Sequence, residues 1–408
     1  MTGLVPLAEA DAAHFRWIAG SPAAKIMAAL EARAPGGSRY VGGSVRDSLL
    51  GEKPKDFDIA TTLLPGDSVS ALGAAGLKSA PTGIEHGTVT GIVEHVGVEI
   101  TTLRSDVSTD GRRATVAFTQ DWAADAGRRD FTINAIYLSA DGRLFDPVGG
   151  VADVRTGRVR FIGEAQDRIR EDYLRILRFF RFSARFARGF DADGLSACAA
   201  LAGGIEKLSA ERIGDEFTRI LALAGAADAI DAMAATGVLE SVWPARPRRS
   251  DFRRLKGFAP EAPAALGLAA LYADAGHGID RALRLANSDA ARRKAAVKAA
   301  SDMSAGLDDR AARALLYAHG ASAWRDGVLI ARARDPSCDW ARLETLADRW
   351  PPAKFPITGK HVVAVGVPPG PRVSEILKRV EAAWIAEDFP GRGRLDAILA
   401  EICSVPKP

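Results

Sequence analysis

Two aspartates separated by one residue, Asp56 and Asp58, are the side chains whose type and spacing most directly suggest chemistry. They lie in the segment DFDIAT, which is expected to form a β-strand. Side chains two positions apart on a strand point to the same side, so both carboxylates face one site while Phe57 and Ile59 face the core. Carboxylate oxygens suit Mg²⁺, and two such ions can stabilise the attacking and leaving oxygens of a phosphoryl transfer. The pair therefore predicts a metal site for nucleotidyl transfer.

A glycine-containing turn precedes the two aspartates. The segment from Tyr40 to Thr61 reads YVGGSVRDSLLGEKPKDFDIAT, in which a strand ends at two glycines and a helix-like stretch follows. Glycines allow backbone amides to approach a triphosphate closely, and the start of a helix favours anions. Arg46 lies one turn further along and can pair with phosphate. Gly43 and Arg46 are therefore predicted to hold nucleotide phosphates over the metals.

Residues 171–188, EDYLRILRFFRFSARFAR, predict an arginine-rich helix. Its arginines recur at spacings of three and four, which places them along one side of a helix. Phe179, Phe182 and Phe186 also approach that side, so the helix is expected to be enclosed by neighbouring elements. Enclosed arginines need anionic or acceptor partners.

Asp172 and Arg175 of this segment could select bases without a template. Cytosine and adenine each present an amino donor beside a ring-nitrogen acceptor, whereas uracil and guanine present a carbonyl beside an N–H. Asp172 can accept from the amino group, and Arg175 can donate to the ring nitrogen. Uracil and guanine would leave both groups mismatched, at about 1–3 kcal/mol per unpaired group. The pair predicts CTP and ATP as substrates.

Taken together, these segments resemble the signature of the tRNA CCA-adding enzyme and bacterial poly(A) polymerase family, the class II nucleotidyltransferases. Residues 42–58 match the pattern GGxVRDxLLGxxxxDxD at every fixed position. Residues 128–137, RRDFTINAIY, and residues 171–182, EDYLRILRFFRF, resemble two further motifs of that family.

The resemblance implies roles for individual residues. Asp56 and Asp58 would be the catalytic metal ligands, with two Mg²⁺ ions expected. Arg129 would contact the nucleotide during transfer, although an ion pair to Asp125 or Asp130 is the alternative. Asp172 and Arg175 would read the base edge, and Arg178 and Arg181 would point toward nucleotide phosphate or ribose. Glu99, in VEITTLRSD, is left open between a third carboxylate near the metals and a strand residue in a surface ion pair.

The pattern of elements predicts an α+β fold with a strand-containing head and a long helical remainder. The polar segment between Leu103 and Asp121 is expected to be a mobile loop that closes over a substrate. Proline-rich stretches at 243–254 and 350–356 are the predicted linkers. The expected parts are a nucleotidyltransferase head (1–147), a helical neck carrying base recognition (148–221), a helical body (222–349) and a helical tail that contacts tRNA (350–408).

The composition favours a globular cytoplasmic protein of more than one core. The chain has 408 residues, of which 47% are hydrophobic and 26% charged. Its start lacks the pattern of a secretory signal, and its three scattered cysteines predict neither a disulfide framework nor structural zinc. The net charge is only +3, but nine arginines face four acidic residues between Arg158 and Arg188. This local excess suits RNA phosphates.

The expected activity is template-independent addition of CCA to the tRNA 3′ end from CTP and ATP, with release of pyrophosphate. A bacterial poly(A) polymerase and a CC-adding or A-adding enzyme are alternatives. Residues 79–93, SAPTGIEHGTVTGIV, resemble the CCA-adding type, because they lack the basic GRRF-like element that poly(A) polymerases of this group tend to show there. A noncatalytic RNA-binding protein would not need Asp56, Asp58, Arg129 and Asp172 together. No membrane or protein partner is implied.

Overall fold

The computed structural model describes residues 3–110, 113–273, 276, 278–304, 306–351 and 353–404, and for residues 106–110 and 113–116 it describes the backbone alone. The chain forms two compact units, Met1–Pro244 and Ala245–Pro408. The boundary between them falls inside the proline-rich stretch at 243–254 that the sequence predicts as a linker. The four-part division into head, neck, body and tail stays a prediction.

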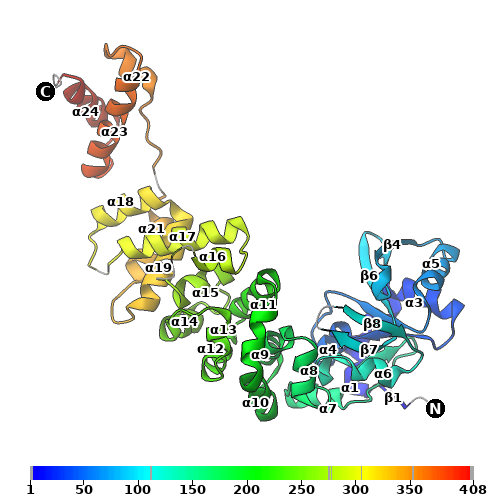
Figure 1. Ribbon diagram of the computed structural model, residues 1–408. Coiled ribbons are helices and arrows are strands. Elements are labelled where there is room, and N and C mark those ends of the chain that lie inside the picture. Colours follow the sequence, from blue (N-terminus) through cyan, green and yellow to red (C-terminus); the bar gives the residue numbers. More distant parts are fainter. Residues whose placement is uncertain are drawn as a thin grey trace. The chain divides into compact units, whose positions relative to one another are not determined.

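Unit 1 begins with a mixed sheet in which β3 and β6 run parallel and the other neighbours run antiparallel, in the order β1-β10-β9-β2-β3-β6-β5-β4. A separate hairpin pairs β7 with β8. The strands are β1 (Leu4–Pro6), β2 (Ser38–Val41), β3 (Asp58–Thr61), β4 (Lys78–Gly83), β5 (Thr88–Val93), β6 (Val96–Thr102), β7 (Arg104–Asp110), β8 (Arg113–Phe118), β9 (Tyr137–Ser139) and β10 (Arg143–Phe145). Together with the helices that follow, this sheet confirms the predicted α+β class (Figure 1).

The helices of unit 1 follow from ordinary start and stop signals; α3, for example, begins with a Ser21 cap and Pro22 in its first turn. The α-helices are α1 (Glu9–Ala12), α2 (Trp17–Gly20), α3 (Pro22–Arg33), α4 (Gly43–Leu49), α5 (Pro65–Ala74), α6 (Trp122–Gly127), α7 (Gly150–Thr156), α8 (Ala165–Glu171), α9 (Leu174–Phe186), α10 (Ala192–Leu201), α11 (Ala210–Ala222), α12 (Ala226–Ala235) and α13 (Val238–Val242). The 3₁₀ helices are η1 (Ala13–Phe15), η2 (Ile84–His86), η3 (Thr132–Asn134) and η4 (Ala202–Lys207).

The sheet is covered on both faces. Helices α3 and α5 pack against β4, β5 and β6, where Gly91 leaves room for Ile26 of α3. A second cluster joins Val41 and Ala60 of the sheet to Trp122 and Ala126 of α6. Burial on both sides fixes β3 in place, and with it the position of the aspartates.

The arginine-rich segment is two helices rather than the single helix that its spacing predicts. Helix α8 ends at Glu171, Asp172 is extended (φ −155°), and α9 begins at Leu174. The reason is local, because an Asp172 carboxylate oxygen accepts the N–H of Leu174 at 3.1 Å and so satisfies the start of α9. Asp172 therefore lies at a helix junction, one turn from Arg175.

The segment expected to be a loop between Leu103 and Asp121 is instead largely a β-hairpin. Strands β7 and β8 pair from Arg104 with Phe118 to Asp110 with Arg113. Gly111 and Arg112 lie outside the described residues. Closure of this hairpin over a substrate stays a prediction.

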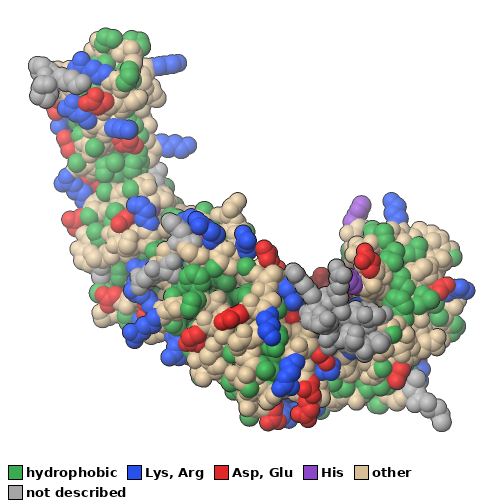
Figure 2. All heavy atoms as spheres, viewed as in Figure 1, with side chains coloured by type: hydrophobic (Ala, Val, Ile, Leu, Met, Phe, Trp, Pro, Cys, Tyr) green, Lys and Arg blue, Asp and Glu red, His purple; other side chains and the backbone are tan. Residues whose placement is uncertain are grey.

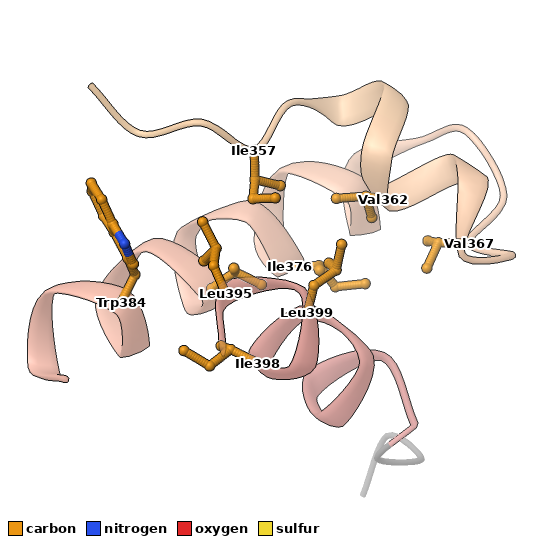
Figure 3. Packing of buried hydrophobic residues seen from close by; sticks show 9 residues of the cluster. Ile357, Val362, Val367, Ile376, Trp384, Leu395, Ile398 and Leu399 are labelled. Atoms are coloured by element: carbon orange, nitrogen blue, oxygen red, sulfur yellow. The ribbon is translucent and has the colours of Figure 1, made fainter. Parts of the chain in front are cut away.

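Unit 2 is helical in its described residues. Its helices are α14 (Arg249–Phe258), α15 (Ala264–Leu271), α16 (Gly278–Ala282), α17 (Asn287–Asp302), α18 (Asp309–His319), α19 (Ala321–Arg334), α20 (Ala341–Glu344), α21 (Leu346–Arg349), α22 (Gly359–Ala364), α23 (Pro371–Ala386) and α24 (Arg392–Ser404). Helices α22, α23 and α24 build their own apolar cluster, which includes Ile357, Ile376 and Trp384 (Figure 3). Lys360 and Arg372 of this tail are exposed.

Candidate active site

A cavity of about 610 Å³ in unit 1 gathers every site residue predicted from the sequence. The predicted residues on its wall are Gly43, Arg46, Asp56, Asp58, Arg129, Asp172, Arg175, Arg178 and Arg181. They come from α4, the bend before β3 and its first residue, the segment after α6, the α8–α9 junction and α9. Their chemical roles stay predictions, but the structure brings all of them to one space.

The two aspartates stand at the beginning of β3. Asp58 is its first residue, whereas Asp56 is exposed in the bend before it, so the expectation that both lie within the strand is wrong for Asp56. Ile59 is fully buried, and Phe57 packs against Trp17 with ring centroids 5.0 Å apart, as predicted for the opposite face. Asp58 is thus anchored by a buried strand, and Asp56 is open to solvent.

Asp58 is surrounded by negative charge. It pairs in register with Glu99 on the parallel strand β6. The pKa of the Asp58 carboxyl is raised to about 6, chiefly because the group is buried and also because the Glu99 and Asp56 carboxylates lie nearby, while Arg129 acts in the opposite direction. The ionised form of Asp58 is therefore unfavourable in this site, and a bound cation would stabilise it.

The aspartate pair fits a metal ion held jointly with a nucleotide. The described residues contain no group of three or more metal-ligating side chains. Mg²⁺ commonly binds through one or two carboxylates together with substrate phosphates, and Asp56 and Asp58 supply the carboxylates. Glu99 lies outside the described cavity wall, and its role stays open.

We expect the charge on Asp58 to destabilise the metal-free protein. A folded-state pKa above the usual value of 3.8 means that stability falls as pH rises from about 4 to about 6. Asp58→Asn removes this charge, so above pH 6 the variant should be more stable by about 2–3 kcal/mol. Urea unfolding in EDTA at pH 4.5 and 7.5 measures the difference. Equal stability at pH 7.5, or a gap that widens toward acid, would contradict the expectation.

Arg129 is held against the cavity by a buried carboxylate. Its Nη2 lies 3.2 Å from Asp125 Oδ2, and its Nε donates to the Tyr137 hydroxyl at 3.2 Å. Burial alone would raise the pKa of the Asp125 carboxyl, but Arg129 and Arg128 outweigh it, and the pKa is lowered. The ion pair considered as an alternative for Arg129 is therefore present, and it fixes the guanidinium beside Asp58.

The glycine turn brings two arginines together. Gly42 has φ +70°, a conformation that favours glycine, and a Cβ there would lie 3.9 Å from Arg129 Nη1. Arg46 donates to Asn134 Oδ1 at 2.6 Å and to Asp47 at 2.7 Å, and its guanidinium carbon lies 4.1 Å from the Phe186 ring centroid. Arg46 is thus buried at the cavity edge and oriented by Asn134, a residue that was not predicted from the sequence.

The arginines of α9 have the acidic partners that their enclosure predicts. Arg178 Nη2 lies 2.6 Å from Asp130, which is buried. Arg181 Nε donates to Glu216 of α11 at 2.5 Å, and Arg178 Nη1 lies 3.7 Å from the same carboxylate. Figure 2 shows basic and acidic side chains interspersed over α9 to α11. Glu216 of α11 was not among the site residues predicted from the sequence.

Glu216 is expected to stabilise unit 1 through these two arginines. Its side chain is 6% exposed, against 30% for Arg178 and 17% for Arg181. Since the arginines are partly solvated, Glu216→Gln should cost about 1–3 kcal/mol, below the roughly 3–5 kcal/mol of a fully buried pair. Urea unfolding measures it, with the exposed Glu206→Gln of η4 as the matched control. Equal stability of both variants would contradict the expectation.

The two residues predicted to read the base, Asp172 and Arg175, keep free hydrogen-bonding capacity. Arg175 donates from Nη1 to Glu171 at 2.5 Å and to the Arg168 carbonyl, and from Nη2 to the Arg128 carbonyl at 3.1 Å. Its Nε–H has no acceptor among the described residues. Each Asp172 oxygen accepts one bond and has a second lone pair. One donor and one acceptor can therefore face a base.

Comparison with known proteins decides the family. The family model described as "Poly A polymerase head domain" matches residues 38–160, and "Probable RNA and SrmB- binding site of polymerase A" matches residues 190–246. CCA tRNA nucleotidyltransferase 1, mitochondrial, of Mus musculus is 33% identical over 364 residues, covering 85% of this chain and 82% of the relative. The chain belongs to the CCA tRNA nucleotidyltransferase family.

Other members agree with this assignment. The CCA-adding enzyme of Streptococcus gordonii is 30% identical over 382 residues, covering 89% of this chain and 92% of that enzyme. The crystal structure of the Bacillus stearothermophilus CCA-adding enzyme in complex with CTP superposes with a TM-score of 0.75 at 27% identity, covering 93% of this chain and 96% of the other. Nucleotidyltransferases of this family are generally metal-dependent. The head-domain match includes Asp56, Asp58 and Arg129.

Proposed function

We propose that this protein adds C, C and A in turn to the 3′ end of tRNA, using CTP and ATP and releasing pyrophosphate. The observation that carries the proposal is the single cavity that holds both the aspartate pair and the Asp172–Arg175 pair. One pair suits phosphoryl transfer, and the other suits cytosine and adenine. The relatives named as CCA-adding enzymes support the same conclusion.

The transfer chemistry is assigned to the carboxylate end of the cavity. Asp56 and Asp58 would hold divalent metal, Mg²⁺ in our proposal, with two ions expected; the metal supplies charge stabilisation for the attacking 3′ oxygen and the pyrophosphate leaving group. Arg129, held by Asp125, would face the transferred phosphate and offset its negative charge. Arg46 and Gly43 would orient the remaining phosphates.

Base selection is assigned to the helix junction. The Asp172 carboxylate would accept from the amino group of cytosine or adenine, and the Arg175 Nε–H would donate to the ring nitrogen. Arg178 and Arg181, held by Asp130 and Glu216, would contact phosphate or ribose. Because the same acceptor and donor serve both bases, one site can handle both nucleotides.

The products of the reaction test the proposal. Transcripts of tRNA that end before C74, after C74 and after C75 are offered to the purified protein with Mg²⁺ and CTP, ATP or both, and the products are sequenced. We expect completion to CCA and a stop after one A. Addition that ends at CC, or addition of A to tRNA ending after C75 with no addition of C to the shorter transcripts, would instead identify a partial enzyme, and long A-tails on unrelated RNA would identify a poly(A) polymerase.

The tail and the cellular location belong to the same proposal. Exposed Lys360 and Arg372 at the start of α22 and α23 are proposed to contact tRNA phosphates. The described helices include none that could cross a membrane. We propose a cytoplasmic location, although the mouse and human relatives are named mitochondrial; fractionation of cells of the source organism tests it.

A further inference from the structure

Arg212 of α11 contacts the carboxylate that we assign to base reading. Its Nη2 donates to Asp172 Oδ2 at 2.7 Å, across 40 residues of sequence. The Arg212 side chain is 44% exposed and that of Asp172 is 33% exposed. Among the described residues, Arg212 forms an ion pair with Asp172 and with no other carboxylate.

The contact completes the fixation of the Asp172 carboxylate. The Leu174 N–H holds Oδ1 at 3.1 Å, and Arg212 holds Oδ2. Two donors, one on each oxygen, set both the position and the plane of the carboxylate. The second lone pair of each oxygen remains for a base, so the group presents acceptors in a fixed direction.

The same side of α11 reaches the site at two further positions. Glu216, four residues after Arg212, holds Arg178 and Arg181, and Arg219, seven residues after Arg212, lines the cavity. Positions four and seven apart lie on one face of a helix. Arg212 is therefore part of a helix face directed at the nucleotide site, although it does not line the cavity itself.

We propose that Arg212 is a specificity-determining positioning residue, which holds Asp172 as an acceptor for the amino group of cytosine and adenine. The inference rests on the proposed function. Without Arg212, the carboxylate is tied only to the Leu174 N–H and can turn away from the base edge. Contact with the amino group weakens, and the penalty against the carbonyl of uracil and guanine falls with it.

Discrimination between nucleotides tests this role. We compare kcat/KM for CTP against UTP on tRNA ending after C74, and for ATP against GTP on tRNA ending after C75. In Arg212→Ala both ratios should fall about tenfold, the size expected for loss of one positioning hydrogen bond to a charged group. Arg212→Lys, which keeps a cationic donor, should recover part of the loss.

A matched control separates positioning from surface charge. Arg155 of α7 is also exposed and also pairs with one carboxylate, that of Asp11 at 2.7 Å, outside the cavity. Arg155→Ala should leave both ratios unchanged, and thermal unfolding should show that all variants are folded.

Three results would overturn the inference. The first is that Arg212→Ala leaves both kcat/KM ratios unchanged. The second is an equal loss of kcat/KM for all four nucleotides, which would indicate a merely structural role. The third is a lower KM for CTP and ATP, which would mean that Arg212 competes with the base for Asp172. Each presumes that the unsubstituted protein incorporates CTP and ATP. If it incorporates neither, the proposed function itself is wrong, which is a different outcome from unchanged discrimination in an active protein.

Discussion

Replacing Asp56 by alanine should lower the transfer of CMP and AMP to tRNA by about a thousandfold or more. A bound metal contributes several kcal/mol to phosphoryl transfer, and each 1.36 kcal/mol is tenfold in rate. Asp56 is exposed in the bend before β3, so its loss should leave the fold intact. Single-turnover incorporation from labelled CTP or ATP measures the effect, with circular dichroism to check folding.

The matched control is a partly exposed aspartate that lies outside the cavity. The Asp67 side chain of α5 is 41% exposed, pairs with Arg33 at 3.2 Å and does not line the cavity. Asp67→Ala should transfer nucleotides at the normal rate. Activity of Asp56→Ala within about tenfold of the unsubstituted protein would contradict the metal role of this pair.

Replacing Asp172 by alanine should lower kcat/KM for CTP and for ATP together, by about ten- to a hundredfold. The amino group of either base would lose its acceptor, which costs about 1–3 kcal/mol. The aspartate pair is untouched, so the Mn²⁺ concentration for half-maximal rate should stay near normal. Steady-state kinetics with tRNA ending after C74 and after C75 measures both nucleotides.

Asp172→Asn provides a sharper version of the same test. The asparagine oxygen can still accept the Leu174 N–H and preserve the start of α9, but its amide presents a donor to the base. The variant should lose CTP and ATP and gain relative use of UTP and GTP. Loss of only one of CTP and ATP, in either variant, would mean that the two bases are read by different groups.

The candidate catalytic and binding residues were predictable because each lies in a short segment whose residue types and spacing indicate its role. Asp56 and Asp58 stand two apart after a glycine turn and a short helix, and Asp172 and Arg175 stand three apart. Such spacings are local, so the sequence carries them directly. That these segments meet in one cavity was implied by the family resemblance and not by the spacing.

The partners of these residues could not be predicted in the same way. Glu216 meets Arg181 across 35 residues, Asp130 meets Arg178 across 48, and Asn134 meets Arg46 across 88. Those contacts depend on tertiary packing, such as that of α9 against α11 and of α4 against η3. Charge pattern alone indicates that the arginines need acceptors, not which carboxylates supply them.

Two of the wrong predictions of secondary structure could have been avoided from signals in the sequence. The helix break at Asp172 follows from aspartate's preference for the residues just before a helix, which competes with the arginine spacing. The β7–β8 hairpin follows from its alternating segments, VST and ATVAF, which were outweighed by the glycine and charged residues between them. In both cases the short segment itself indicated the observed structure, and the prediction followed the composition or spacing of a longer stretch instead.

The most direct test of one site for both nucleotides is a pair of structures, one with CTP and one with ATP, each with Mn²⁺ located by anomalous scattering. We expect the amino nitrogen of both bases within hydrogen-bond distance of the Asp172 carboxylate, the ring nitrogen beside Arg175, and Mn²⁺ between Asp56, Asp58 and the triphosphate. Cytosine and adenine bound at different groups, or Mn²⁺ away from both aspartates, would contradict the shared site.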